Sequence, residues 1–300
     1  MFLQQLINGL TVGSVYALIA LGYTMVYGIL EFINFAHGEI YMIGAYLGII
    51  GLGAITALGW NSLPVLIVVL LVFLFAMFYA ASFGVTIERL AYRPLRNAPR
   101  LAPLISALGV SIFLQNFVMV TQGARDKVFP DLLPRVGLEI GTARISFVQI
   151  FIMSTSLGLM VALTLFISKT RLGKAMRATA QDQKMASLVG IDVDRVISMT
   201  FVIGSGLGAA AGVMVALYYG LVNFYIGYVA GLKAFTAAVL GGIGNIPGAM
   251  LGGIVLGLAE SFGAGYLSSE YKDVYAFILL VLLLIFRPQG ILGERVPEKM

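Results

Sequence analysis

The chain has 300 residues, of which 60% are hydrophobic and only 11% are charged, and its formal net charge is +5. A soluble domain carries about 25% charged residues, so this composition indicates an all-α, polytopic membrane protein. The apolar runs are continuous and do not alternate with polar residues, which argues against a membrane β-barrel. The basic residues gather in loops, where they set topology and contact anionic lipid, so the positive charge does not indicate a nucleic-acid partner.

Cysteine is absent, and His37 is the single histidine. Disulfide bonds, thiolate metal sites and thiol catalysis are therefore excluded, and one imidazole does not build a multi-histidine metal site. The sequence has no Walker A motif, no GxSxG and no HExxH, so we expect no catalytic site, no metal and no bound cofactor. The first residues lack a basic n-region and a cleavage site, and we interpret them as the start of the first span.

Long apolar runs predict the membrane spans, each of which needs about 20 mostly apolar residues. We predict eight spans within a range of seven to nine, and nine if a glycine-broken pair of segments near 232–261 crosses the membrane twice. Together they make residues 1–300 a single transmembrane domain. The predicted segments are Leu6–Tyr27, Ile40–Leu58, Pro64–Ile87, Leu101–Val120, Phe147–Ser168, Val196–Tyr219, the pair Leu232–Leu240 and Gly248–Ser261, and Val274–Phe286.

Loop charge predicts the orientation of the spans, because basic residues collect on the cytoplasmic side. The loop 88–100 has four arginines, ending at Arg100, and the segment 168–195 has six basic residues. Both are therefore predicted to be cytoplasmic. Alternation places the loop 121–146 outside. Its prolines, Pro130 and Pro134, predict an ordered, turn-rich loop or a short surface helix.

The cytoplasmic segment 168–195 also has the pattern of a folded element. Met185, Leu188 and Val189 fall at i, i+3 and i+4, which predicts a short helix with one apolar face. An N-cap is predicted at residue 182 and a C′ glycine at residue 190. Two interpretations stay open: an ordinary positive-inside loop, or a docking surface for a cytoplasmic partner.

Glycine is frequent, with 36 residues, and several glycines are four positions apart. This spacing allows membrane helices to approach closely. Gly204, Gly208 and Gly212 form a double GxxxG, which either packs helices within the subunit or forms a face against a second membrane subunit. The stretch Gly241–Gly248 contains glycines and a proline that break a helix, and it is predicted to be a hinge or a re-entrant turn.

A polar cluster separates the first two spans. Glu31, Asn34, His37 and Glu39 lie within nine positions, and ionisable groups at membrane depth are candidates for functional residues. They make a proton relay or half of a metal site conceivable. Alternatively, the cluster lies at a membrane face, where both glutamates are solvated and Asn34 caps the next helix.

Two further charged residues flank the glycine-broken pair. Lys233 lies near the start of one segment and can extend its ammonium group to the interface, and Glu260 ends the next segment and is expected at the interface too. A proton-driven carrier needs a carboxylate in mid-span. The sequence shows none in the middle of a clear apolar run.

Several motifs resemble one family of transport proteins. INFAHGEIYMIGAY at Ile33–Tyr46 is similar to the signature of the membrane subunits of branched-chain amino-acid ABC importers, and the match is to the LivH type. The similarity continues in order over nearly the whole chain. It includes IERLAYRPLR at Ile87–Arg96, KMASLVGIDVDRVISMTFVIG at Lys184–Gly204, KAFTAAVLGGIGNIPGAMLGG at Lys233–Gly253 and RPQGILG at Arg287–Gly293.

The resemblance implies a non-catalytic permease of the bacterial inner membrane that imports Leu, Ile or Val. In the family, such a subunit pairs with a homologous LivM-type permease, two cytoplasmic ATPase subunits bind the ATP, and a soluble external binding protein delivers the amino acid. The family's ATPase-contacting loop maps onto Ala180–Ile191. Its matching positions are Ala180, Asp182, Met185, Ala186 and Gly190.

The motifs assign no residue that contacts the substrate. As pathway residues we predict Asn34, His37 and Lys233. One alternative is the same architecture with urea, amides or other amino acids as cargo. A second is an ion-coupled secondary carrier, which would depend on the polar cluster at residues 31–39 and on the broken helix.

Overall fold

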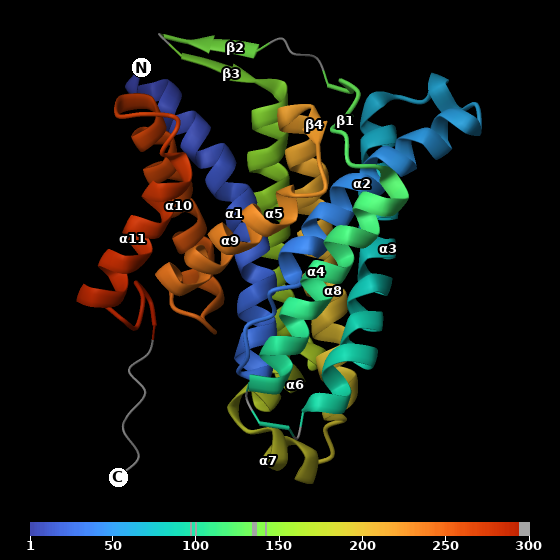
Figure 1. Cartoon of the computed structure of the whole chain (residues 1–300), viewed down its shortest axis with the longest axis vertical. Coiled ribbons are helices and arrows are strands. Elements are labelled where there is room, and N and C mark those ends of the chain that lie inside the picture. Colours follow the sequence, from blue (N-terminus) through green and yellow to red (C-terminus); the bar gives the residue numbers. More distant parts are fainter. Residues whose placement is uncertain (97, 100, 134–136, 142, 294–300) are drawn as a thin grey trace.

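Three helices form the buried centre of the molecule: α1 (Phe2–Leu30), α2 (His37–Ala57) and α8 (Val193–Tyr219) (Figure 1). The computed structural model describes residues 1–96, 98–99, 101–133, 137–141 and 143–293. Arg100 and Pro134 lie outside these residues. The central helices are apolar on all sides, which is expected of helices surrounded by other helices.

The outer helices expose apolar side chains. They are α3 (Val65–Ile87), α4 (Leu101–Gln122) and α5 (Phe147–Lys169). On α3, the stripe Leu66, Leu70, Leu74 and Phe78 is more than half exposed at every position. Such stripes suit contact with lipid chains. The short turn η1 (Trp60–Ser62) precedes α3, and the π-helical η2 (Glu88–Tyr92) and η3 (Arg93–Leu95) follow it.

In the described part of the chain, seven helices are long and apolar enough to cross a membrane: α1, α2, α3 with its continuation to Leu95, α4, α5, α8 and α10 (Ile246–Tyr266). The predicted polytopic helical fold is confirmed, and the chain is a multi-pass membrane protein. Helices α9 (Ile226–Gly241) and α11 (Lys272–Phe286) are shorter. The 16 residues of α9 rise about 24 Å, which is less than the roughly 30 Å of a bilayer's hydrocarbon core.

The predicted glycine break is present between α9 and α10. Gly242 and Gly244 have φ angles of 103° and 91°, which the turn requires and which side chains disfavour. Asn245 caps α10, because its side chain accepts the Gly248 N–H at 3.0 Å. The C-terminal segment docks on this turn: the N–H of Leu292 donates to the carbonyl of Gly241 at 3.0 Å, and Asn245 Nδ2 donates to the Leu292 carbonyl at 2.8 Å.

Two small antiparallel sheets and two short helices lie at opposite ends of the long axis (Figure 1). β1 (Lys127–Val128) pairs with β4 (Leu221–Val222), and β2 (Gly137–Ile140) forms a hairpin with β3 (Ala143–Ser146). The loop 121–146 thus contains strands, and its described residues form no surface helix. The N-terminus lies at the hairpin end, and α6 (Arg171–Gln181) and α7 (Gln183–Leu188) lie at the other.

Glycines allow α1 and α10 to approach at backbone distance. A Cβ atom added at Gly257 would lie 2.3 Å from Gly13 Cα, and one added at Gly253 would lie 2.4 Å from Ala17 Cα. No side chain fits into such a gap, so the small residues on both helices are a condition of this contact.

The glycines of α8 face helices of the same chain. A Cβ atom at Gly212 would lie 2.1 Å from the Tyr41 carbonyl oxygen of α2, and one at Gly208 would lie 3.4 Å from the His37 ring. A Cβ atom at Gly204 would lie 3.5 Å from Gly22 Cα of α1. In this structure the double GxxxG therefore packs helices within the subunit.

Candidate functional site

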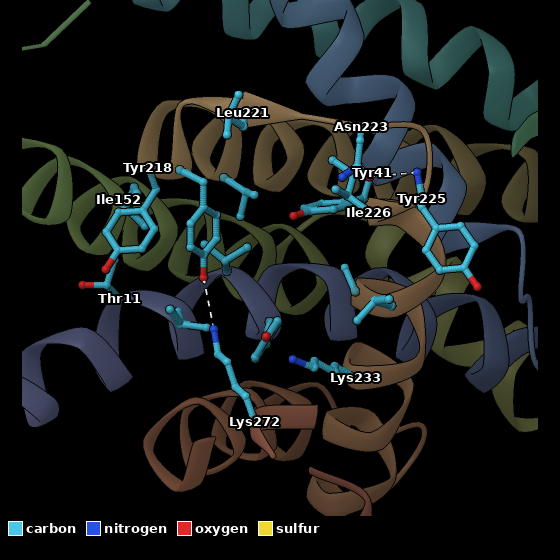
Figure 2. A pocket seen from close by; sticks show the side chains of 17 residues that line it. Thr11, Tyr41, Ile152, Tyr218, Leu221, Asn223, Tyr225, Ile226, Lys233 and Lys272 are labelled. Carbon is cyan, nitrogen blue, oxygen red and sulfur yellow. Dashed lines mark hydrogen bonds between the residues drawn. The ribbon is translucent and has the colours of Figure 1, made fainter. Parts of the chain in front are cut away.

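A cavity of about 330 Å³ lies among α1, α2, α5, α8, α9 and α11 (Figure 2). Ligand sites in proteins commonly measure about 300–1,000 Å³, so this volume suits a small solute. Aliphatic side chains from α1, α8 and α9 form much of the wall. Five tyrosines also line it: Tyr16, Tyr41, Tyr218, Tyr219 and Tyr225.

A cluster of four charges borders the cavity. Lys233 Nζ lies 2.9 Å from Oε1 of Glu260 and 2.5 Å from Oδ1 of Asp273, and Lys272 Nζ lies 3.1 Å from the same Glu260 oxygen. Both lysines line the cavity. Lys233 is 4% exposed and Glu260 is 1% exposed, so both side chains are buried in the protein, and their position at the membrane interface stays a prediction. Their burial is tolerated because opposite charges meet.

Aromatic rings complete the surroundings of the two ammonium groups. Lys233 Nζ lies 5.8 Å from the ring centroid of Tyr16, and Lys272 Nζ lies 5.8 Å from that of Tyr219. Lys272 Nζ also lies 3.4 Å from the Tyr219 hydroxyl. In Figure 2 both lysines point into the cavity from one side, and Tyr218 stands on the other. Aromatic faces attract cations, so the wall itself favours positive charge.

Of the three predicted pathway residues, Lys233 lines this cavity, whereas Asn34 and His37 do not. Asn34 is buried, and its Oδ1 accepts the Tyr92 hydroxyl at 2.6 Å, which ties the loop after α1 to η2. Ala36 is the N-cap of α2, so the predicted cap at Asn34 is wrong. A pathway role for Asn34 and His37 stays a prediction.

Glu39 is fully buried, with 0% exposure, inside α2. The Ser111 hydroxyl donates to its Oε1 at 3.1 Å. A Cβ atom at Gly227 would lie 2.5 Å from its Oε2, so the absence of a side chain there makes room for the carboxylate. The expectation of a solvated glutamate at this position is therefore wrong. Glu39 lies in the first turn of α2 and not in the middle of the span.

The predicted features of the segment after α5 come together at α7. Asp182 is the N-cap, and its Oδ1 accepts the N–H groups of Lys184 and Met185 at 2.8 and 3.0 Å. Gly190 has a φ angle of 86°, as its predicted place after the helix requires. Ala186 is buried and holds the helix against the rest of the chain. Ala180 lines a small cavity of about 90 Å³ beside α1.

The apolar face of α7 is exposed. Met185, Leu188 and Val189 have 60%, 79% and 76% of their surface accessible, although they belong to residue types that are usually buried. An exposed apolar patch at the end of a molecule is typical of a docking surface. One contact that the sequence did not suggest links this helix to the core: Gln183 Nε2 donates to the Ile29 carbonyl at the end of α1, at 2.5 Å.

Comparisons with known proteins agree over the whole length of the chain. Residues 5–284 match the family model described as "Branched-chain amino acid transport system / permease component". The "High-affinity branched-chain amino acid transport system permease protein BraD" of Pseudomonas aeruginosa is 54% identical, over 100% of this chain and 98% of that protein. The corresponding protein LivH of Escherichia coli K12 is 52% identical, with the same coverage of both chains. The similarity therefore extends to every element described above.

Proposed function

Since the chain belongs to the family of branched-chain amino acid transport permease components, we propose that it is the membrane permease subunit of an ABC importer for Leu, Ile and Val. The observation that carries this proposal is the identity above 50% over the full chain to permeases named for this transport. The seven long apolar helices supply the membrane-spanning body that such a subunit needs.

ATP-driven import requires a surface on which the ATPases act. The exposed face of α7, made of Met185, Leu188 and Val189, is the surface we assign to this contact. The cap at Asp182 and the buried Ala186 hold α7 as a fixed unit. The hydrogen bond from Gln183 to the end of α1 connects α7 directly to this central helix. Movement of the ATPase is transmitted to α1 through this contact. A ligand or partner shifts a conformational equilibrium only through contacts that differ between the states.

The remaining assignments follow from the place of the chain in such an importer. We assign to it no catalytic reaction and no cofactor, because ATP is bound and hydrolysed by the two partner subunits. The second membrane subunit is a homologous LivM-type permease, and the complex lies in the bacterial inner membrane. The soluble binding protein docks at the end that carries the N-terminus and the β2–β3 hairpin, opposite α7.

The ion-coupled carrier is the alternative that one observation favours, because Glu39 is a buried carboxylate in the first turn of a membrane helix. Such groups are typical of proton pathways. The full-length similarity to ABC-type permeases favours the importer, in which Glu39 has a structural role beside Ser111. The two functions predict different energy sources.

Reconstitution separates them. The chain is placed in liposomes with its partner permease, ATPases and binding protein, and uptake of labelled leucine is measured with and without ATP. We expect uptake that requires ATP and the binding protein, with leucine, isoleucine and valine competing for it. Uptake driven by a pH gradient without ATP would support the carrier instead. ATP-driven uptake of urea but not of leucine would support an importer of the same architecture with a different substrate.

A further inference from the structure

We propose that the cavity lined by Lys233 and Lys272 is the point at which the permease itself recognises the zwitterionic head of a neutral amino acid during passage. This inference rests on the proposed function and names a binding site for its substrate. The site is a weak, transient one within the path, because a transport path must release what it binds.

The cavity offers partners for both charges of a zwitterion. A carboxylate can bind between the ammonium groups of Lys233 and Lys272, which already share one oxygen of Glu260. The tyrosine rings of the cavity wall attract the ammonium group of the ligand through cation–π contact.

The charge sum of the cluster favours a ligand without net charge. The two lysines balance Glu260 and Asp273, so the cluster is neutral as a whole. A zwitterion keeps this balance, whereas a net charge added to a largely buried site would be left uncompensated at low dielectric. Neutral amino acids are therefore favoured over lysine or glutamate.

The four groups differ in freedom to rearrange. The side chains of Lys233 and Glu260 are 5% and 1% exposed, whereas those of Lys272 and Asp273 are 36% and 58% exposed. Lys233 and Glu260 thus form the fixed part of the site. Lys272, at the start of α11, is the group that can turn from Glu260 toward an incoming carboxylate.

The rest of the wall suits a branched aliphatic side chain. It presents Val12, Val15, Ile152, Val215, Ile226 and Val229 beside the tyrosine rings. An apolar wall gains from every methyl group that leaves water, and it offers little to urea or to a small amide. The lining also includes Leu221, whose strand pairs with β1 at the hairpin end, so the site lies on the side where the binding protein would release its load.

Direct binding to the complete membrane complex tests the assignment. The complex is placed in nanodiscs without binding protein, and tritiated leucine is measured by scintillation proximity at millimolar concentrations. We expect Lys272→Met to weaken leucine binding at least tenfold. Lys127→Met removes a lysine that bonds Gln122 outside the cavity and is the matched control, with binding within twofold of the unmodified complex. Equal binding by Lys272→Met and the unmodified complex would overturn the proposal.

Competition binding on the unmodified complex tests the site without depending on whether a variant folds. Leucinamide lacks the carboxylate, and 4-methylpentanoate lacks the ammonium group. Each should compete at least tenfold less well than valine, and equal competition would refute recognition of the head. Ala230→Leu adds bulk to the cavity wall without removing a charge and should reduce leucine binding more than alanine binding. If it leaves both unchanged, the amino acid does not occupy this cavity.

The uptake assay with ATP and binding protein distinguishes failure of the proposed function from failure of this binding site. Absence of ATP-driven leucine uptake by the unmodified complex would reject the proposed function. Normal uptake together with unaltered binding in Lys272→Met and Ala230→Leu would reject this site alone.

Discussion

Lys233 of α9 and Glu260 of α10 form an ion pair inside the helix bundle, with Nζ 2.9 Å from Oε1. The pair joins the two helices on either side of the glycine turn, and both residues are almost fully buried. A buried ion pair contributes little net stability, whereas removal of one partner leaves a charge without compensation. This ion pair therefore predicts that substitution of one partner destabilises the protein more than substitution of both.

Glu260→Ala should be strongly destabilising, by about 3–5 kcal/mol, because Asp273 alone then remains to compensate the two ammonium groups of Lys233 and Lys272. The double variant Lys233→Met with Glu260→Met should be more stable than Glu260→Ala, since it removes one positive and one negative charge together and keeps the cluster neutral. Thermal unfolding of the purified protein, followed by fluorescence-detected size exclusion, measures both. Glu139→Ala on the exposed β2 strand is the control, and a double variant no more stable than the single one would contradict this account.

Alanine substitutions should have opposite effects at two glycines, one inside the contact between α1 and α10 and one outside it. Gly257→Ala should cost about 1–3 kcal/mol, the usual range for overpacking, because its Cβ atom would lie 2.3 Å from Gly13 Cα. Gly158→Ala in the exposed middle of α5 meets nothing within 4 Å. It should be neutral or stabilising by up to about 1 kcal/mol, because alanine has the higher helix propensity. Thermal unfolding of the two variants tests this prediction. Similar shifts of the melting temperature in both would show that the close approach of α1 and α10 is not needed for stability.

Local patterns allowed much of the fold to be predicted. Continuous apolar runs set the long helices, because a segment in a membrane must satisfy its own backbone hydrogen bonds. The cap at Asp182 and the left-handed Gly190 followed from short-range rules. The break at Gly241–Gly248 did too, since glycine and proline act on their immediate neighbours.

The interior contacts depend on partners that are distant in the sequence. Glu39 was expected in water, yet it is buried because Ser111 of α4 reaches it and Gly227 of α9 leaves space. Glu260 is buried in the protein because Lys233 and Lys272 compensate its charge. Opposite charges on two neighbouring apolar segments were the available signal for that pair. The cavity had no such signal, because its wall is assembled from six helices.

The two ends of the molecule predict opposite sides of the membrane for two engineered thiols. The chain has no cysteine, so Glu139→Cys in β2 and Ser187→Cys in α7 each carry the single reactive thiol. An impermeant maleimide added to intact spheroplasts should label residue 139, and residue 187 should react only after permeabilisation. The cysteine-free chain serves as the blank. Labelling of both positions from outside would reverse the orientation inferred from loop charge.

The apolar face of α7 makes a prediction about coupling that is separate from stability. Met185→Arg places a charge in the middle of the exposed face formed with Leu188 and Val189. Because Met185 is 60% exposed, the folded chain should tolerate the substitution, with a melting temperature close to that of the unmodified protein. Transport should fall at least tenfold, because an unpaired charge at the centre of an apolar contact is costly.

Ser187→Arg is the matched control, since it adds the same charge to the same exposed helix but lies about 200° around the axis from Met185, away from the apolar face. It should retain leucine uptake within about twofold. The ratio of ATP hydrolysed to leucine transported distinguishes the two variants. This ratio should rise for Met185→Arg alone, because ATPases that no longer contact α7 hydrolyse ATP without moving the permease. An equal loss of uptake in both variants would indicate a general effect of charge at this end of the molecule, and unaltered coupling in Met185→Arg would place the ATPase contact on another surface.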